Sequence, residues 1–111
     1  MNKAIIGLFF VTALSVHAAQ ADSTQHQVTA QGCNFAESFI VDAYFQLNKG
    51  NPNAANNIST NINNSRDFDK RVGARAANSF INEYNIWGAQ YGQWANQNIR
   101  SWCNQHIGDS I

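Results

Sequence analysis

Two cysteines, Cys33 and Cys103, constrain the fold of this chain more than any other feature of its sequence. They stand 70 positions apart and follow an apolar N-terminal run that is typical of exported proteins. An even number of cysteines in an oxidising compartment favours an intramolecular disulfide. Closing a loop of this length stabilises a fold by roughly 4 kcal/mol in the chain-entropy treatment. We therefore expect one disulfide, which joins the first helix of a single domain to the last.

The N-terminus has the parts of an export signal. Lys3 is followed by an apolar run at residues 4–14 that is too short for a stable membrane anchor, and small residues stand at Ala18 and Ala21. We expect a signal peptide at residues 1–21, with cleavage after Ala21 and cleavage after Ala18 as the alternative. The mature protein is then periplasmic or secreted, and it has no membrane segment.

The part of the chain after the signal suffices for one small domain. Its apolar residues recur at helical spacing, which predicts an all-α fold, a small bundle of about four helices. We expect a flexible N-terminal lead at residues 22–32, a single helical domain at residues 33–107 and a C-terminal tail at residues 108–111. Gly108 is the expected stop of the last helix.

The first predicted helix, residues 33–50, begins with Asn34 as its N-cap. Apolar residues surround almost the whole of this helix, because Val41, Tyr44 and Phe45 lie off its main apolar stripe. Either the helix is central in the bundle, or part of it contacts a partner. These three residues are therefore the candidates for binding a partner.

The second and third helices have weaker signals. Asn51 and Pro52 suit the first positions of a helix, and the third helix is expected to begin near Ser65 or Asp67. In the third helix, Gly73 would let another helix approach closely.

Residues 80–103, projected as one helix, carry an aromatic face within about 140° of arc. Its members are Phe80, Ile81, Tyr84, Trp87, Gly88, Tyr91, Trp94, Ala95, Ile99 and Trp102. Since this is also the only apolar face, we interpret it mainly as core. Gly88 and Gly92 each disfavour a helix by about 1 kcal/mol, so a break near them is the alternative. If part of the face is exposed, Trp87, Trp94 and Trp102 are candidates for stacking on a ligand.

Charge and motif content narrow the function classes. After cleavage, six basic and seven acidic residues leave a net charge of −1, which argues against nucleic acid or an anionic membrane as a partner. The sequence contains no phosphate-binding loop, dinucleotide fingerprint, zinc-protease motif or nucleophile elbow. Two cysteines without a nearby histidine cluster make a poor metal site. We expect no catalytic, cofactor-binding or metal-binding residues, and hence no enzyme.

The leading hypothesis is a protein-binding module that docks on another protein, as an immunity or inhibitor protein does. A homodimer would use the same surface. In size and compartment the chain is similar to small periplasmic immunity proteins and to acid-stress chaperones, although it carries no motif of either. The alternatives are a periplasmic stress chaperone and a cell-wall or glycan-binding protein that uses exposed tryptophans.

Overall fold

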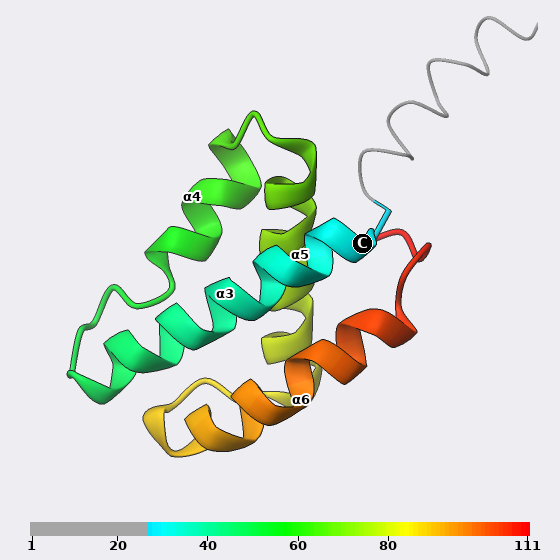
Figure 1. The fold of residues 1–111 in the computed structure, drawn as a ribbon. Coiled ribbons are helices and arrows are strands. Elements are labelled where there is room, and N and C mark those ends of the chain that lie inside the picture. The colour runs from blue at the N-terminus through cyan, green and yellow to red at the C-terminus, as the bar shows by residue number, and fades with distance from the viewer. Residues whose placement is uncertain (1–26) are drawn as a thin grey trace, which may run out of the picture.

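The computed structural model describes residues 27–111, and within them the fold is all-α, as predicted. The predicted signal peptide, its cleavage sites and residues 22–26 of the predicted lead lie outside the described residues. Four α-helices and one short 3-10 helix make up the described part (Figure 1). Their bounds are α3 Ala30–Asn48, α4 Asn56–Asn64, α5 Phe68–Tyr84, η1 Ala89–Tyr91 and α6 Gly92–Gln105.

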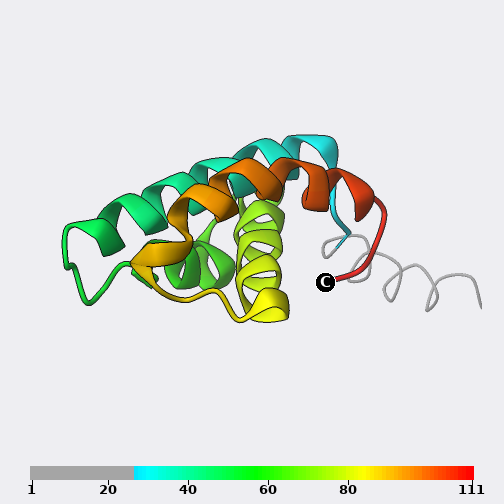
Figure 2. The ribbon, with the colours of Figure 1, turned by 90° about the horizontal axis from the view of Figure 1, so that it is seen from below.

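The helices form two layers. Helices α3 and α6 run antiparallel and side by side in one layer, and α5 crosses beneath α3 with α4 at its side (Figure 2). The core lies between the layers, where α5 meets the undersides of both upper helices. Its largest side chains come from all four helices: Phe39, Ile40, Tyr44, Ile58, Val72, Phe80, Ile81, Ile99 and Trp102.

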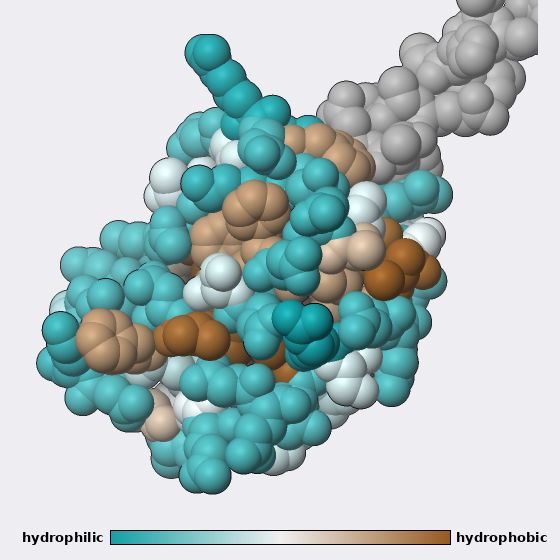
Figure 3. Space-filling model, in the orientation of Figure 1, coloured by the Kyte–Doolittle hydropathy of each residue, from teal (hydrophilic) through white to brown (hydrophobic). Residues whose placement is uncertain are grey.

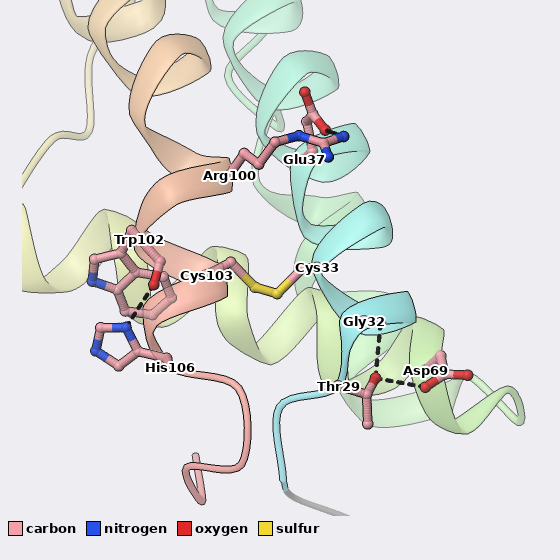
Figure 4. Close-up of a disulfide and its surroundings, with 9 residues drawn as sticks. All are labelled: Thr29, Gly32, Cys33, Glu37, Asp69, Arg100, Trp102, Cys103 and His106. Atoms are coloured by element: carbon pink, nitrogen blue, oxygen red, sulfur yellow. Dashed lines mark hydrogen bonds and ion pairs between the residues drawn. A yellow bond between two sulfur atoms is a disulfide. The ribbon is translucent and has the colours of Figure 1, made fainter.

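The predicted disulfide between Cys33 and Cys103 is confirmed. It connects the first turn of α3 to the last turn of α6, with the two Cα atoms 5.6 Å apart (Figure 4). Both cysteines are buried, and the described residues include no free thiol. The bond therefore closes the upper layer of the bundle at one end.

Helix α3 begins earlier than the sequence pattern indicates. Its N-cap is Thr29, whose hydroxyl oxygen accepts a hydrogen bond from the backbone N–H of Gly32 at 2.8 Å. The same hydroxyl donates to a carboxylate oxygen of Asp69 at 2.7 Å, which ties the start of α3 to the start of α5 (Figure 4). The predicted N-cap Asn34 is wrong, because this tertiary bond favours Thr29.

The last residues are also more ordered than predicted. The backbone N–H of Val28 donates to the carbonyl oxygen of Asp109 at 2.9 Å, and the N–H of Gly108 donates to the carbonyl oxygen of Val28 at 2.8 Å. Ile111 packs against the core. Residues 27–32 of the predicted flexible lead are therefore part of the fold, because Val28 pairs with the C-terminal tail and α3 begins at Ala30.

Helix α4, in contrast to α3, begins later than the sequence predicts. The predicted start at Asn51 and Pro52 is a turn, in which the side-chain oxygen of Asn51 accepts from the backbone N–H of Asn53 at 2.9 Å. The helix itself starts at Asn56.

The crossing of α3 over α5 depends on Gly73. A Cβ atom at this position would lie 2.5 Å from the Cβ of Phe35 and 2.6 Å from the backbone oxygen of Gly32. The close approach of another helix at Gly73, which the sequence predicts, is thus present, and it brings the backbones of α3 and α5 together.

Candidate functional site

Residues 80–103, which the sequence analysis projected onto one helical wheel, are divided by a loop. Helix α5 ends at Asn85, which has a left-handed backbone with φ 54° and ψ 49°, and Gly88 has φ 150°. The chain turns there and continues into η1 and α6. The sequence left open whether the helix continues through the two glycines, and the structure shows a break near Gly88.

This break divides the aromatic face into an inner and an outer set. Phe80, Ile81 and Trp102 are buried, as the core interpretation requires. Four other side chains are each between 37 and 46% exposed and lie around the connection between α5 and α6. We call these four the aromatic patch: Tyr84, Trp87, Tyr91 and Trp94. For them the core interpretation is wrong, because two separate helices do not share one buried stripe.

Phe80 is the centre of the ring packing beneath the patch. Trp94 stacks on Phe80 with an interplanar angle of 7° and ring centroids 5.8 Å apart. Tyr84 meets Trp94 edge-on at 5.2 Å, and Trp102 meets Phe80 edge-on at 5.5 Å. Such offset and edge-on pairs are favourable ring geometries, and they hold Trp94 and Tyr84 in place at the surface.

The three stacking candidates have different surroundings. The indole N–H of Trp87 donates to the side-chain oxygen of Asn82 at 3.2 Å, and that of Trp102 donates to Glu83 at 3.2 Å. Trp102 also stacks on His106, with ring centroids 4.0 Å apart (Figure 4). Among the described residues, the indole N–H of Trp94 has no protein acceptor. Trp94 is therefore the exposed tryptophan with a free donor.

A small cavity lies beside Trp94, between α5 and α6. Its volume is about 150 Å³, and it is lined by the aromatic residues Tyr84, Trp94 and Trp102, with the buried Phe80 behind them. Its rim consists of Asn98, Ser101 and Gln105. These rim residues were not predicted from the sequence. Their spacing from Trp94, by four, seven and eleven positions, places them on one face of a helix and is a signal that could have found them.

A second hollow lies on the other side of Tyr84 and Trp94. It has a volume of about 350 Å³ and is completed by Ile86 and Tyr91. The two hollows share Tyr84 and Trp94, so this pair of rings forms the ridge between them.

The three partner-binding candidates on α3 all line one groove between α3 and α6, but they differ in exposure. Val41 and Phe45 are 48 and 54% exposed, but Tyr44 is only 1% exposed. Its hydroxyl group donates to the backbone carbonyl of Ile86 inside the bundle. The expectation that Tyr44 contacts a partner is corrected, because its side chain points into the core toward the α5–α6 loop. We call the remaining pair, Val41 and Phe45, the α3 face.

The α3 face adjoins a groove between α3 and α6. The groove has a volume of about 420 Å³, and the amides of Asn48, Gln93 and Asn96 line it together with Val41 and Phe45. Figure 3 shows apolar side chains over the C-terminal half of α3, separated by hydrophilic ones. The face thus has an apolar centre, which amides border on the side of the groove and Glu37 and Asp42 border along α3.

Charged groups lie at both ends of the α3 face. The ammonium group of Lys49 lies 4.6 Å from the ring centre of Phe45, at cation–π distance. One turn before Val41, Glu37 forms an ion pair with Arg100 at 2.6 Å, which connects α3 to α6 next to the disulfide (Figure 4). Exposed pairs of this kind stabilise a fold by at most about 1 kcal/mol, so this one serves mainly to order the surface.

Within residues 27–111, no group of three His, Cys, Asp or Glu side chains is arranged to hold a metal ion. No helix in this range has the length and apolar content needed to cross a membrane.

Comparisons with known proteins give no relative: no family model matches the chain, and no curated protein and no solved structure is significantly similar to it.

Proposed function

We propose that this protein is an exported protein-binding module that docks on another protein through the α3 face and acts by binding alone. The observation that carries the proposal is the exposure of Val41 and Phe45, one helical turn apart, beside the groove between α3 and α6. An interface of this kind has an apolar centre that excludes water and a polar border that fixes orientation. The amides that line the groove supply that border without a charge requirement.

The proposed partner is a folded protein of the same compartment, and the proposed role is that of an inhibitor or immunity protein. A disulfide suits a protein that works outside the reducing cytoplasm. The rigid bundle favours such a role, because a surface that is already ordered loses little entropy on docking. A second copy of the chain is the alternative occupant of the same face.

The alternative of an acid-activated chaperone has less support. Such chaperones release an apolar surface when carboxylates become protonated, and this requires acids that hold the surface closed. No charged side chain among the described residues is buried. A light-scattering assay with an aggregating client protein at acidic and neutral pH tests this alternative. Suppression of aggregation only at acidic pH would favour the chaperone over the docking proposal.

The test of the proposal is capture of a partner by the tagged, oxidised protein from periplasmic and secreted extracts. The double variant Val41→Ser with Phe45→Ser is expected to lose the captured partner while keeping its melting temperature. The matched control is Ile107→Ser, which removes an equally exposed apolar side chain outside the α3 face and should leave capture unchanged.

Light scattering coupled to size exclusion separates the two occupants of the face. A dimer that dissociates in the double variant would make a second copy the occupant. If a single stoichiometric partner stays bound to the double variant, the docking surface is not the α3 face.

A further inference from the structure

The cavity between α5 and α6 is chemically distinct from the α3 face. None of its lining residues belongs to α3, and it opens beside Trp94 instead of Phe45. Its walls are aromatic rings, whereas its rim carries an amide, a hydroxyl and a second amide. It therefore calls for a ligand with an apolar face and several neutral hydrogen-bonding groups at its edge.

The size of the cavity limits the ligand to one ring. Sites for drug-sized molecules have volumes of roughly 300–1,000 Å³, well above the 150 Å³ found here. A cavity of about 150 Å³ engineered in another protein accepts benzene, a single six-membered ring. This cavity is open at one side, so a ring that enters it can carry substituents that extend into solvent.

Among the described residues, no group with a formal charge lines the cavity. The nearest carboxylate along the chain, Glu83, accepts the indole N–H of Trp102 and is thereby engaged. A ligand with a formal charge would lose its hydration shell here without gaining a counter-charge. The ligand that fits is therefore neutral.

We propose that this cavity binds one pyranose ring of a neutral glycan, with an apolar C–H face against Trp94 and its hydroxyl groups toward the rim. A pyranose is a six-membered ring that combines an apolar face with hydroxyl groups at its edge, which matches the walls and rim described above. This proposal is independent of the docking of a protein on the α3 face.

The rim retains hydrogen-bonding groups for such hydroxyls. The amide nitrogen of Asn98 donates to the backbone oxygen of Trp94 at 2.8 Å, which orients the side chain and leaves its carbonyl oxygen as an acceptor. Gln105 donates to the hydroxyl oxygen of Ser101 at 3.5 Å, which leaves the Ser101 hydrogen as a donor. The indole N–H of Trp94 is a further donor. The rim therefore offers both kinds of partner that a sugar hydroxyl needs.

The ridge formed by Tyr84 and Trp94 extends the site. Beyond it lies the second hollow, which contains Tyr91. The next sugar of a bound glycan would cross this ridge and contact the ring of Tyr91. We therefore expect a disaccharide to bind more tightly than its monosaccharide.

The experiment is a nuclear magnetic resonance titration of the oxidised protein, which resolves individual indole and amide signals. The probes are cellobiose, maltose, N,N′-diacetylchitobiose, the corresponding monosaccharides, a sulfated heparin disaccharide, and N-acetylphenylalanine amide as a mimic of a peptide side chain. At least one neutral disaccharide is expected to shift the Trp94 indole and Asn98 amide signals, while the sulfated one leaves them unchanged. Comparing the shifts caused by the three neutral disaccharides shows which kind of glycan the cavity prefers.

Two sets of variants test the assignment. Trp94→Leu should weaken binding about tenfold or more, since it removes one stacking surface, whereas Trp94→Tyr should retain most of it. The double variant Ser101→Ala with Gln105→Ala lies on the exposed rim and tests hydrogen bonding without disturbing the ring packing. The control variant Phe45→Ser should bind sugar normally, because it changes only the α3 face.

Three results would overturn the proposal. One is the absence of shifts at Trp94 and Asn98 with every neutral sugar at millimolar concentration. Another is sugar binding that both Trp94→Leu and the rim variant leave intact. The third is preferential binding of N-acetylphenylalanine amide, which would make the cavity a pocket for a peptide side chain.

Discussion

The hydroxyl group of Tyr44, on α3, donates a hydrogen bond to the backbone carbonyl oxygen of Ile86, 42 residues further along the chain. Ile86 directly follows Asn85, the left-handed residue at which α5 ends. The bond therefore fixes the loop from which the aromatic patch extends. Burial, together with a smaller effect of the nearby Tyr91, raises the pKa of Tyr44 to about 12.

Replacing Tyr44 by phenylalanine should lower the free energy of unfolding by about 1–3 kcal/mol, because the buried carbonyl of Ile86 loses its donor. Chemical denaturation measures this change. The control is Tyr84→Phe, which removes an equivalent hydroxyl from an exposed ring and should change stability by less than about 0.5 kcal/mol. Equal effects of the two substitutions would contradict the anchoring role of Tyr44.

The same tyrosine predicts a loss of stability at alkaline pH. Its pKa is about 12 in the folded chain against 10.0 for an ordinary tyrosine, so the unfolded chain releases this proton first. The contribution is complete below pH 10.0 and is lost between pH 10.0 and about 12, at up to roughly 1.4 kcal/mol per pH unit. Between pH 10.0 and about 12, the free energy of unfolding should fall more steeply with pH for the wild type than for Tyr44→Phe. Parallel curves would refute the assignment.

Substituting Gly73 by alanine should destabilise the protein by about 1–3 kcal/mol, even though alanine favours helices, because the new methyl group meets the backbone of α3. Gly92→Ala is the matched control. There the added atom lies 3.3 Å from the Cβ of Tyr44, so the expected change stays within about 1 kcal/mol. Thermal melts of both variants decide the point, and a stabilised Gly73→Ala variant would show that the helices separate easily.

Loss of the disulfide should cost about 2–4 kcal/mol, mainly because the unfolded chain gains freedom. Denaturation with and without reductant measures this in the wild type. The variant with both Cys33→Ala and Cys103→Ala should match the reduced wild type and be insensitive to reductant. If the oxidised and the reduced wild type are equally stable, the disulfide does not stabilise the fold.

Deleting residues 108–111 should lower stability by about 1–3 kcal/mol, since it removes both backbone bonds to Val28 and the packing of Ile111. The amide of Val28 should then exchange its hydrogen faster. Asp109→Ala keeps the backbone carbonyl and is expected to behave as the wild type. Unchanged exchange at Val28 after the deletion would mean that the pairing does not form in solution.

Much of the fold follows from local patterns in the sequence. The apolar spacing predicts the helical class, and the compartment predicts the disulfide between Cys33 and Cys103. Gly73 indicates a close helix crossing by its lack of a side chain. These features depend on residue type and spacing, which a sequence displays directly.

The errors concern residues whose state depends on distant partners. Thr29 caps α3 with the help of Asp69, 40 positions away, and Tyr44 is buried because Ile86 offers it an acceptor. On a helical wheel Tyr44 lies about 40° beyond the edge of the main stripe and Phe45 about 80° beyond it, so the wheel places Tyr44 on the flank, and the acceptor on the α5–α6 loop accounts for its full burial. Part of the aromatic face was misassigned for a related reason, since the break after α5 places Trp87, Tyr91 and Trp94 on a separate segment and leaves them exposed.

The pairing of Val28 with Asp109 and Gly108 also determines how the molecule would respond to mechanical force. A pull applied to the two ends of the described chain first meets two backbone hydrogen bonds, which separate at low load. The tension then passes from Cys33 to Cys103 through their covalent bond. The helices between the cysteines lie outside this load path and keep their packing. A protein tethered at both ends would thus keep the α3 face and the aromatic patch intact under strain.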